Sequence, residues 1–184
     1  MLIATDEEGG NVARISTNRN IRNSTFKSPQ NLYKQGGFTL IRDNVIEMST
    51  LLYSLGINVN FAPVADISTN SNDYIYSRTI GQDKEGTSKF VSTVINESKN
   101  YNVSYTMKHF PGYGNNKDTH QGVAVDNRNI NTIIENDLKP FDAGIKEQGE
   151  AIMVSHNIIN NLDNTKPASL SYKVHNLARQ NLNF

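Results

Sequence analysis

Four short apolar segments, each followed by a stretch of helical periodicity, constrain the fold of this chain more than any other feature. The segments that we expect to form buried strands are residues 2–5, 57–62, 103–109 and 151–155. The stretches that we expect to form helices are residues 41–55, 84–100, 130–145 and 171–182. Strands that alternate with amphipathic helices pair in parallel through right-handed crossovers. The order therefore predicts an α/β fold of about four consecutive βα units with parallel strands.

Single residues mark some boundaries of these elements. Gly56 stands where a helix commonly ends in a left-handed residue, and Ser171 is a typical N-cap for the last helix. Pro140 falls inside the third helical stretch, so we expect a kink there or a restart with the proline at the first helical position. Residues 16–37 are polar, and we expect them to form a long loop before the first helix.

Length and charge exclude several classes of protein. The 184 residues are enough for one domain with a sizeable core, and we expect that domain to span residues 1–184. The chain has 18 basic and 18 acidic side chains, which gives no long-range attraction to nucleic acid or to an anionic membrane. It has no cysteine, which excludes disulfides and thiolate chemistry. No apolar run approaches the roughly 20 residues that span a bilayer.

Reactive side chains follow the expected strands at the point where each strand ends. The residues at these positions are Asp6, Asp66, Lys108, His109 and His156. The carboxyl ends of parallel strands meet at one edge of the sheet, and ligands of α/β proteins bind there. The sequence therefore predicts a functional site at that edge.

The loop from Lys108 to His120 is the richest in ionisable groups. It holds two of the four histidines in the chain, and Asp118 stands two residues before His120. In an extended segment such residues point to the same side, so the carboxylate can orient the imidazole as a general acid/base. A rival interpretation is a metal site formed by His109, Asp118, His120 and His156. None of these spacings is a recognised metal motif.

Three cationic side chains, Arg14, Arg78 and Lys108, are expected at the same edge as Asp6. A carboxylate with cationic donors around it suits a neutral polyhydroxylated ligand such as a sugar. Each arginine alone is more often part of a surface ion pair of little energetic weight. Gly9 and Gly10 follow a strand but lack the spacing of a phosphate-binding loop, which argues against a nucleotide site.

These residues lie in motifs that resemble glycoside hydrolase family 3, specifically its β-N-acetylhexosaminidase branch. The motifs run through the whole chain, at residues 3–14 (IATDEEGGNVAR), 56–66 (GINVNFAPVAD), 78–81 (RTIG), 108–120 (KHFPGYGNNKDTH), 152–156 (IMVSH) and 167–171 (PASLS). The resemblance implies part of a TIM (β/α)8-type barrel that releases terminal N-acetylglucosamine from cell-wall or chitin fragments without a cofactor or metal.

The resemblance also implies roles for individual residues. His120, oriented by Asp118, would be the acid/base. The sugar would be held by Asp6, Arg14, Arg78, Lys108 and His109. Two positions depart from the family pattern, because the family usually has Arg at Asn11 and commonly His at Tyr113.

The family's nucleophile is an Asp on the strand that follows the last helix of this chain. Because the chain ends at Phe184, we expect an incomplete barrel that cannot complete turnover alone. About four βα units of an eight-unit barrel would leave sheet edges open, so self-association is also expected.

Three alternatives remain beside this prediction. A catalytically inert sugar-binding module would need the same carboxylate and cations but no nucleophile. A metal-dependent hydrolase would use the histidine and aspartate cluster. The glucosidase branch of the same family lacks the Asp-x-His loop. Residues 1–4 have no signal-peptide character, so the chain would be cytoplasmic if Met1 is its natural start.

Overall fold

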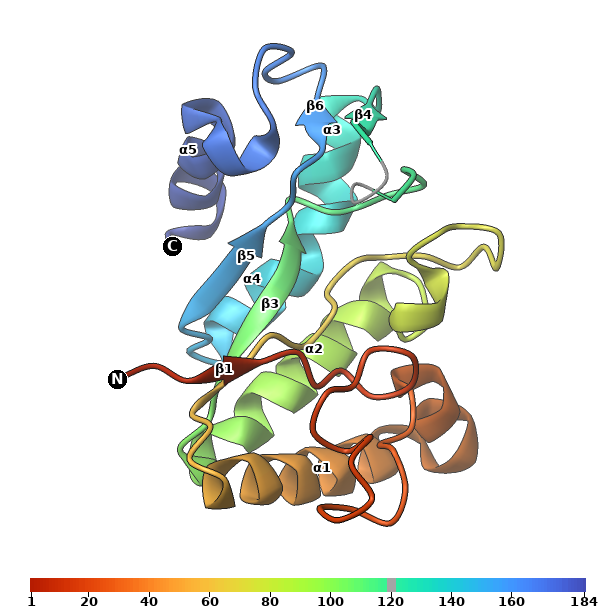
Figure 1. The fold of residues 1–184 in the computed structure, drawn as a ribbon. Helices are drawn as coiled ribbons and strands as arrows, with labels where there is room; N and C mark the ends of the chain where they lie inside the picture. The colour runs from red at the N-terminus through yellow and green to blue at the C-terminus, as the bar shows by residue number, and fades with distance from the viewer. Residues whose placement is uncertain (119–121) are drawn as a thin grey trace.

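The protein is described by a computed structural model that covers residues 1–118 and 122–184. Its main sheet has four parallel strands in the order β1-β2-β3-β5 (Figure 1). Their bounds are Ala4–Thr5, Val59–Asn60, Ser104–Phe110 and Ala151–Val154. Cα pairing aligns Ala4 with Val59 and Thr106 with Ala151. The predicted α/β fold with parallel strands is confirmed, although β1 and β2 are shorter than the apolar segments that contain them.

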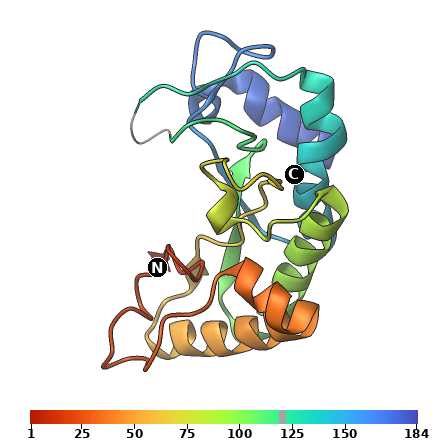
Figure 2. The same cartoon turned by 90° about the vertical axis from the view of Figure 1, so that its right-hand side faces the viewer.

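The long helices form a layer on one side of this sheet, and α2 lies between α1 and α4 (Figures 1 and 2). The helices are α1 (Pro29–Ser54), α2 (Lys84–Ser98), α4 (Leu138–Lys146) and α5 (Tyr172–Leu182). Shorter helical turns are η1 (Tyr76–Arg78), η2 (Lys99–Tyr101), α3 (Ile130–Thr132), η3 (Ile133–Asp137) and η4 (Ala168–Leu170). A separate parallel pair joins β4 (Val125–Asp126) to β6 (Ile158–Ile159).

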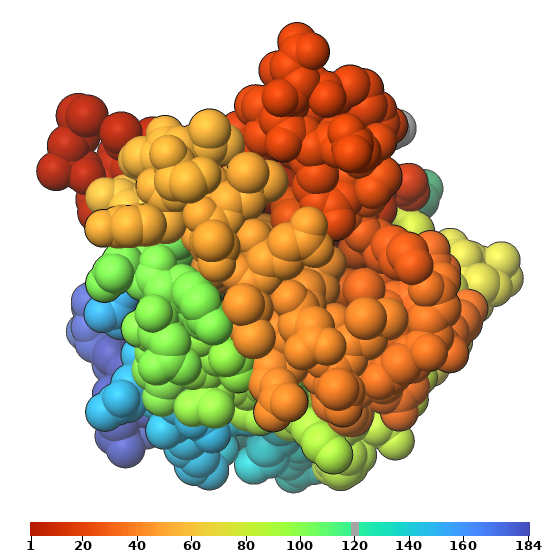
Figure 3. Space-filling view, turned by 90° about the horizontal axis from the view of Figure 1, so that it is seen from below, coloured from red at the N-terminus to blue at the C-terminus, as the bar shows by residue number. Residues whose placement is uncertain are grey.

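The core lies between this helix layer and the sheet. The apolar side of α1 recurs at helical spacing and is buried, as the sequence predicts. Seen from below, α1 covers much of that end of the molecule (Figure 3). On the other side of α2, helix α4 packs so closely on β3 that a Cβ at Gly144 would lie 2.2 Å from Met107 Sδ. The core therefore fixes β3, the strand that carries Lys108 and His109.

Helix α1 begins within the segment that the sequence predicts to be a loop, so the expectation for residues 16–37 is wrong from Pro29 onwards. Ser28 caps the helix by accepting a hydrogen bond from the Asn31 amide, and Pro29 takes the first position. Both are preferred helix-start residues. Gly37, with φ 60° and ψ −150°, then breaks the helix into two parts. Ser28 and Pro29 therefore mark the start of a helix inside a polar segment.

The other boundary predictions have mixed outcomes. Gly56 has φ +77° just past α1, and the Ser171 side chain caps α5, both as expected. The third helical stretch is interrupted by the π-helical turn η3 and restarts at Leu138. Pro140 therefore occupies the third position of α4 and not the first. The proline has no amide to donate, and it lies just after a turn in which the α-helical pattern is already displaced, because the Leu138 amide donates to the Ile133 carbonyl five residues earlier.

No helix in the described part of the chain is long and apolar enough to cross a membrane.

Candidate active site

A buried lysine organises the carboxyl edge of the sheet. Lys108 lies near the end of β3, and its side chain is only 2% exposed. Its ammonium nitrogen is 2.7 Å from Asp6 Oδ1 and 2.5 Å from Glu8 Oε1. Asp6 follows β1 directly and keeps a side-chain exposure of 39%. Lys108 therefore links the ends of two strands and holds the carboxylate of Asp6 at the surface.

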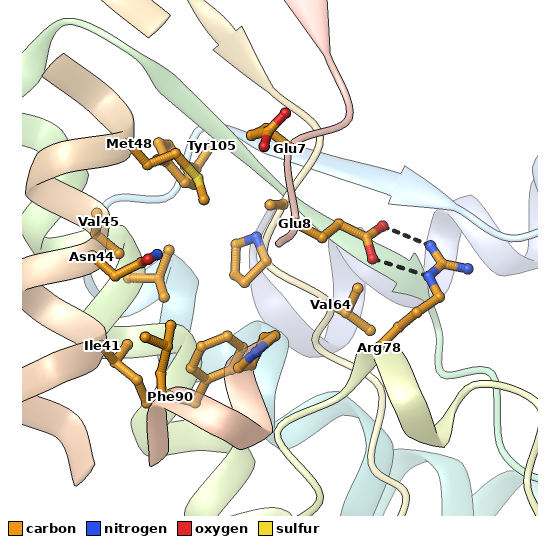
Figure 4. A pocket seen from close by; sticks show the side chains of 15 residues that line it. Glu7, Glu8, Ile41, Asn44, Val45, Met48, Val64, Arg78, Phe90 and Tyr105 are labelled. Atoms are coloured by element: carbon orange, nitrogen blue, oxygen red, sulfur yellow. Dashed lines mark hydrogen bonds and ion pairs between the residues drawn. The ribbon is translucent and has the colours of Figure 1, made fainter. Parts of the chain in front are cut away.

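Glu8 connects this lysine to Arg78 at the end of η1. The guanidinium donates two hydrogen bonds to the carboxylate, at 3.0 Å from Nε and 2.7 Å from Nη2 (Figure 4). Burial alone would lower the pKa of Arg78, but the Glu8 carboxylate overrides it and the pKa is raised. Glu8 is itself buried between two cations. Loss of either Glu8 or Arg78 would leave the other as an uncompensated charge away from water, which favours the paired geometry.

Asp66 and His109 extend the network to the second strand. The Asp66 carboxylate is buried and lies 2.7 Å from His109 Nδ1. The other ring nitrogen of His109, Nε2, lies 3.3 Å from Arg78 Nη2. A guanidinium can only donate, so Nε2 accepts and the ring proton sits on Nδ1, facing Asp66. This assigns His109 as a neutral imidazole with a fixed orientation.

Glu7 shapes the loop that follows β1. Its buried carboxylate accepts hydrogen bonds from the amides of Arg14 and Ile15, both at 2.8 Å, and from the Ser16 hydroxyl. Its own amide donates to the side chain of Asn60 at the end of β2. Neither Glu7 nor Glu8 is among the site residues that the sequence predicts. Their place immediately after Asp6, at the end of β1, is the sequence feature that could have identified them.

Two predicted site residues are not drawn into this network. Arg14 has its amide tied to Glu7, but its side chain is exposed and donates to the Ala13 carbonyl at 3.3 Å. His156 is exposed, and its Nδ1 lies 2.8 Å from the Ser169 hydroxyl. The remaining predicted residues at strand ends, Asp6, Asp66, Lys108 and His109, are brought together.

The loop after β3 is held by aromatic contacts and hydrogen bonds. The ring of Tyr113 lies 5.6 Å from that of His109 and 5.8 Å from that of Tyr74. Its hydroxyl donates to the Lys117 carbonyl at 2.9 Å. Tyr74 hydrogen-bonds Asp118, and its pKa is raised, first by burial and then by this carboxylate. Asp118 is thus held beside the cluster. His120 lies outside the described residues.

A mostly apolar pocket lies beside the charged network, between α1, α2 and the sheet (Figure 4). Glu7, Glu8 and Arg78 line it together with side chains such as Ile41 and Phe90. Few polar groups line this pocket, whereas Asp6 presents an exposed carboxylate to a ligand. Within residues 1–118 and 122–184, no three His, Asp or Glu side chains form a group able to hold a metal ion.

Comparison with known proteins gives the family of this chain. Residues 1–184 match the model of the glycosyl hydrolase family 3 N-terminal domain. The chain belongs to this family. Its TIM-barrel-like α/β fold and its place among glycoside hydrolases therefore follow, as the sequence predicts. It is 28% identical over 181 residues to "Beta-hexosaminidase LpqI" of Mycobacterium tuberculosis, covering 97% of this chain and 46% of that protein.

Other family 3 proteins give a similar result. A "Beta-hexosaminidase" of Xylella fastidiosa strain M23 is 30% identical over 175 residues, covering 93% of this chain and 51% of that protein. The structure of a family 3 β-N-acetylglucosaminidase from Paenibacillus sp. superposes with a TM-score of 0.90 at 27% identity. That match covers 100% of this chain and 35% of that structure. The chain spans about half the length of the curated relatives above.

Proposed function

We propose that this chain carries the sugar-holding and acid/base parts of a retaining β-N-acetylhexosaminidase, within one catalytic domain that includes residues 1–184. The observation that carries the proposal is the linked set of largely buried charged and polar side chains at the carboxyl edge of the parallel strands. It consists of Lys108, Glu8, Arg78, His109 and Asp66, with Asp6 at its exposed end. The relatives are named beta-hexosaminidases, and the family resemblance adds terminal N-acetylglucosamine on cell-wall or chitin fragments as the expected substrate class.

Asp6 is the group that we expect to bind the sugar. Its carboxylate is fixed by Lys108 and remains 39% exposed, so it can accept hydrogen bonds from adjacent hydroxyls. Lys108 and Arg78 act mainly by fixing the carboxylates around them. His109 is oriented by Asp66 and presents its edge beside Arg78. Arg14 stays a proposed contact that would have to swing in from the surface.

The acid/base role falls to His120 with Asp118, as the Lys108–His120 motif implies. Retaining hydrolysis also needs a nucleophilic carboxylate. The family resemblance assigns that carboxylate to an Asp on a strand later than Phe184. The proposal therefore gives these 184 residues the sugar subsite and the acid/base but not the nucleophile.

Calorimetric titration of the chain with N-acetylglucosamine tests the sugar subsite. We expect saturable binding, and about 10- to 100-fold weaker binding for Asp6→Asn, because a charge-assisted hydrogen bond contributes about 1.5–3 kcal/mol. The matched control is Asp142→Asn, an aspartate paired with Lys146 on the outer face of α4. No saturable binding, or equal loss in both variants, would contradict the assignment.

A chromogenic aryl N-acetyl-β-glucosaminide tests the catalytic part. We expect binding without turnover from the 184-residue chain. Turnover that His120→Ala abolishes would show a complete site and refute the assignment of the nucleophile elsewhere. Tight sugar binding that His120→Ala and Asp118→Asn leave unchanged would be compatible with an inert sugar-binding module.

We also propose self-association through the ends of the main sheet. β1 and β5 are its outer strands, and the residues before β1 are exposed, with Leu2 at 82% and Ile3 at 40%. An outer strand offers unpaired backbone groups to another chain. Sedimentation velocity over a range of concentrations tests this, and a monomer at every concentration would refute it.

A further inference from the structure

One peptide group in the Lys108–His120 loop is held at both ends by charged side chains. The carbonyl of Gly112 accepts a hydrogen bond from Arg128 Nη2 at 3.1 Å. The amide of Tyr113, which belongs to the same peptide group, donates to Asp66 Oδ1 at 2.7 Å. A cation thus binds the carbonyl end, and an anion binds the amide end. Charged groups make the stronger hydrogen bonds of this kind.

The guanidinium of Arg128 also binds two carboxylates besides the loop carbonyl. Its Nε and Nη2 bind the Asp126 carboxylate at the end of β4, at 3.0 and 2.7 Å. Its Nη1 binds Asp137 at 2.7 Å. Burial alone would lower the pKa of Arg128, yet the two aspartates raise it well above its usual value. The two carboxylates fix the position of the guanidinium, and from that position Nη2 donates to the Gly112 carbonyl.

The loop lies directly on this ion cluster. A Cβ added at Gly112, where φ is +130°, would stand 2.5 Å from Asp137 Oδ1. A Cβ added at Gly114, where φ is +60°, would stand 2.5 Å from Arg128 Cζ. Both glycines are therefore needed for the close approach as well as for their backbone conformation. Asp137 itself ends the π-helical turn η3, which aims it at the loop.

We propose that Arg128 is a positioning residue for the acid/base loop. It fixes the Gly112–Tyr113 peptide, and the Tyr113 hydroxyl then fixes the Lys117 carbonyl, one residue before Asp118. This chain of contacts sets where Asp118 stands relative to His109 and Asp6. The described contacts of the Arg128 side chain are with Asp126, Asp137 and the Gly112 carbonyl, so we assign its effect to the loop. The inference rests on the proposed acid/base role of Asp118 and His120.

The test compares Arg128→Gln and Arg128→Lys with Arg179→Gln, the same change at an exposed arginine of α5. Hydrogen exchange measures protection of the segment 112–118. In Arg128→Gln we expect its exchange to be at least about tenfold faster, with unchanged exchange in β3 as evidence that the fold is intact. The lysine variant keeps the charge but not the planar fork, so we expect an intermediate effect. If Arg128→Gln fails to fold, the exchange of Arg128→Lys is compared with that of the wild type instead.

Titration of the histidine ring signals by NMR supplies a readout that a purely structural role would not move. The chain has only four histidines, and Asp118→Asn identifies the signal that depends on that carboxylate. We expect Arg128→Gln to move the midpoint of His120 towards its midpoint in Asp118→Asn.

Unchanged loop exchange in a folded Arg128 variant would refute the inference. Faster exchange of residues 112–118 together with an unchanged titration midpoint of His120 would refute the role of Arg128 in positioning the acid/base. If Asp118→Asn itself leaves His120 unchanged, the proposed dyad fails, and this result is distinct from a failure of the Arg128 contact.

Discussion

Replacing Lys108 by methionine tests whether the charged network is held together as the structure indicates. Lys108→Met keeps most of the apolar stem and removes the ammonium that bridges Asp6 and Glu8. Glu8 would then remain buried with Arg78 as its cationic partner. We expect the free energy of unfolding to fall, because a buried carboxylate loses part of its neutralising charge.

The structure sets the size of this loss. Two unit charges 4 Å apart attract by about 4 kcal/mol at an effective dielectric constant of about 20. Desolvation offsets much of that, and removing one partner of a buried pair typically costs about 3–5 kcal/mol. Arg78 still neutralises Glu8, and Asp6 is 39% exposed, so we take the lower end, about 3 kcal/mol. For a chain of this length that corresponds to a melting temperature lower by about 6–12 °C.

A double-mutant cycle with Glu8→Gln isolates the pair from the rest of the site. Thermal and urea unfolding of the two single variants and the double variant should give a coupling of about 2 kcal/mol. The matched control is Lys146→Met, because Lys146 makes the same kind of contact with Asp142 on an exposed helix face. We expect that control to change stability by no more than about 0.5 kcal/mol. A coupling near zero, or equal effects of the two lysine variants, would refute the reasoning.

Three further predictions concern single loop residues. Tyr113→Phe removes the hydrogen bond to the Lys117 carbonyl and should cost about 1 kcal/mol of stability, with faster hydrogen exchange confined to that loop. Gly112→Ala should cost about 3 kcal/mol in urea unfolding, because its Cβ would meet Asp137 at a positive φ. Hydrogen bonds with Ser171 and then Thr165 lower the pKa of Asp163 to about 2, so its stabilising effect is present above pH 4 and lost as pH falls towards 2. The stability difference between wild type and Asp163→Asn should therefore shrink as the pH falls from 4 to 2 and vanish below pH 2.

The fold could be predicted from the sequence wherever periodicity was strong. Four apolar segments and the helices between them gave the parallel order, because few topologies accommodate that alternation. The start of α1 could not be predicted in the same way. The turn before Gly37 buries only Pro29 and Leu32, so it shows no apolar stripe. Its only signals were the cap at Ser28 and the proline after it, which also occur in loops.

The candidate site was predictable only for residues fixed by strands. Asp6, Asp66 and Lys108 were found because strand ends share an edge, whatever the loops do. Arg14 belongs to a loop whose path depends on Glu7, and no spacing rule gives the direction of its side chain. Arg128 was missed for a related reason. Its aspartate partners are near in sequence, but the Gly112 carbonyl that it binds can be identified only in three dimensions.

The balance of charge within the network indicates which kind of ligand it favours. Two cations, Lys108 and Arg78, face three carboxylates, those of Asp6, Glu8 and Asp66. His109 adds no charge, because its Nε2 must accept from Arg78. The network thus carries one net negative charge, and the member with substantial exposure is Asp6. A negative, hydrogen-bond-accepting rim repels anions and attracts hydroxyl donors, so a neutral sugar fits it better than a phosphorylated one would.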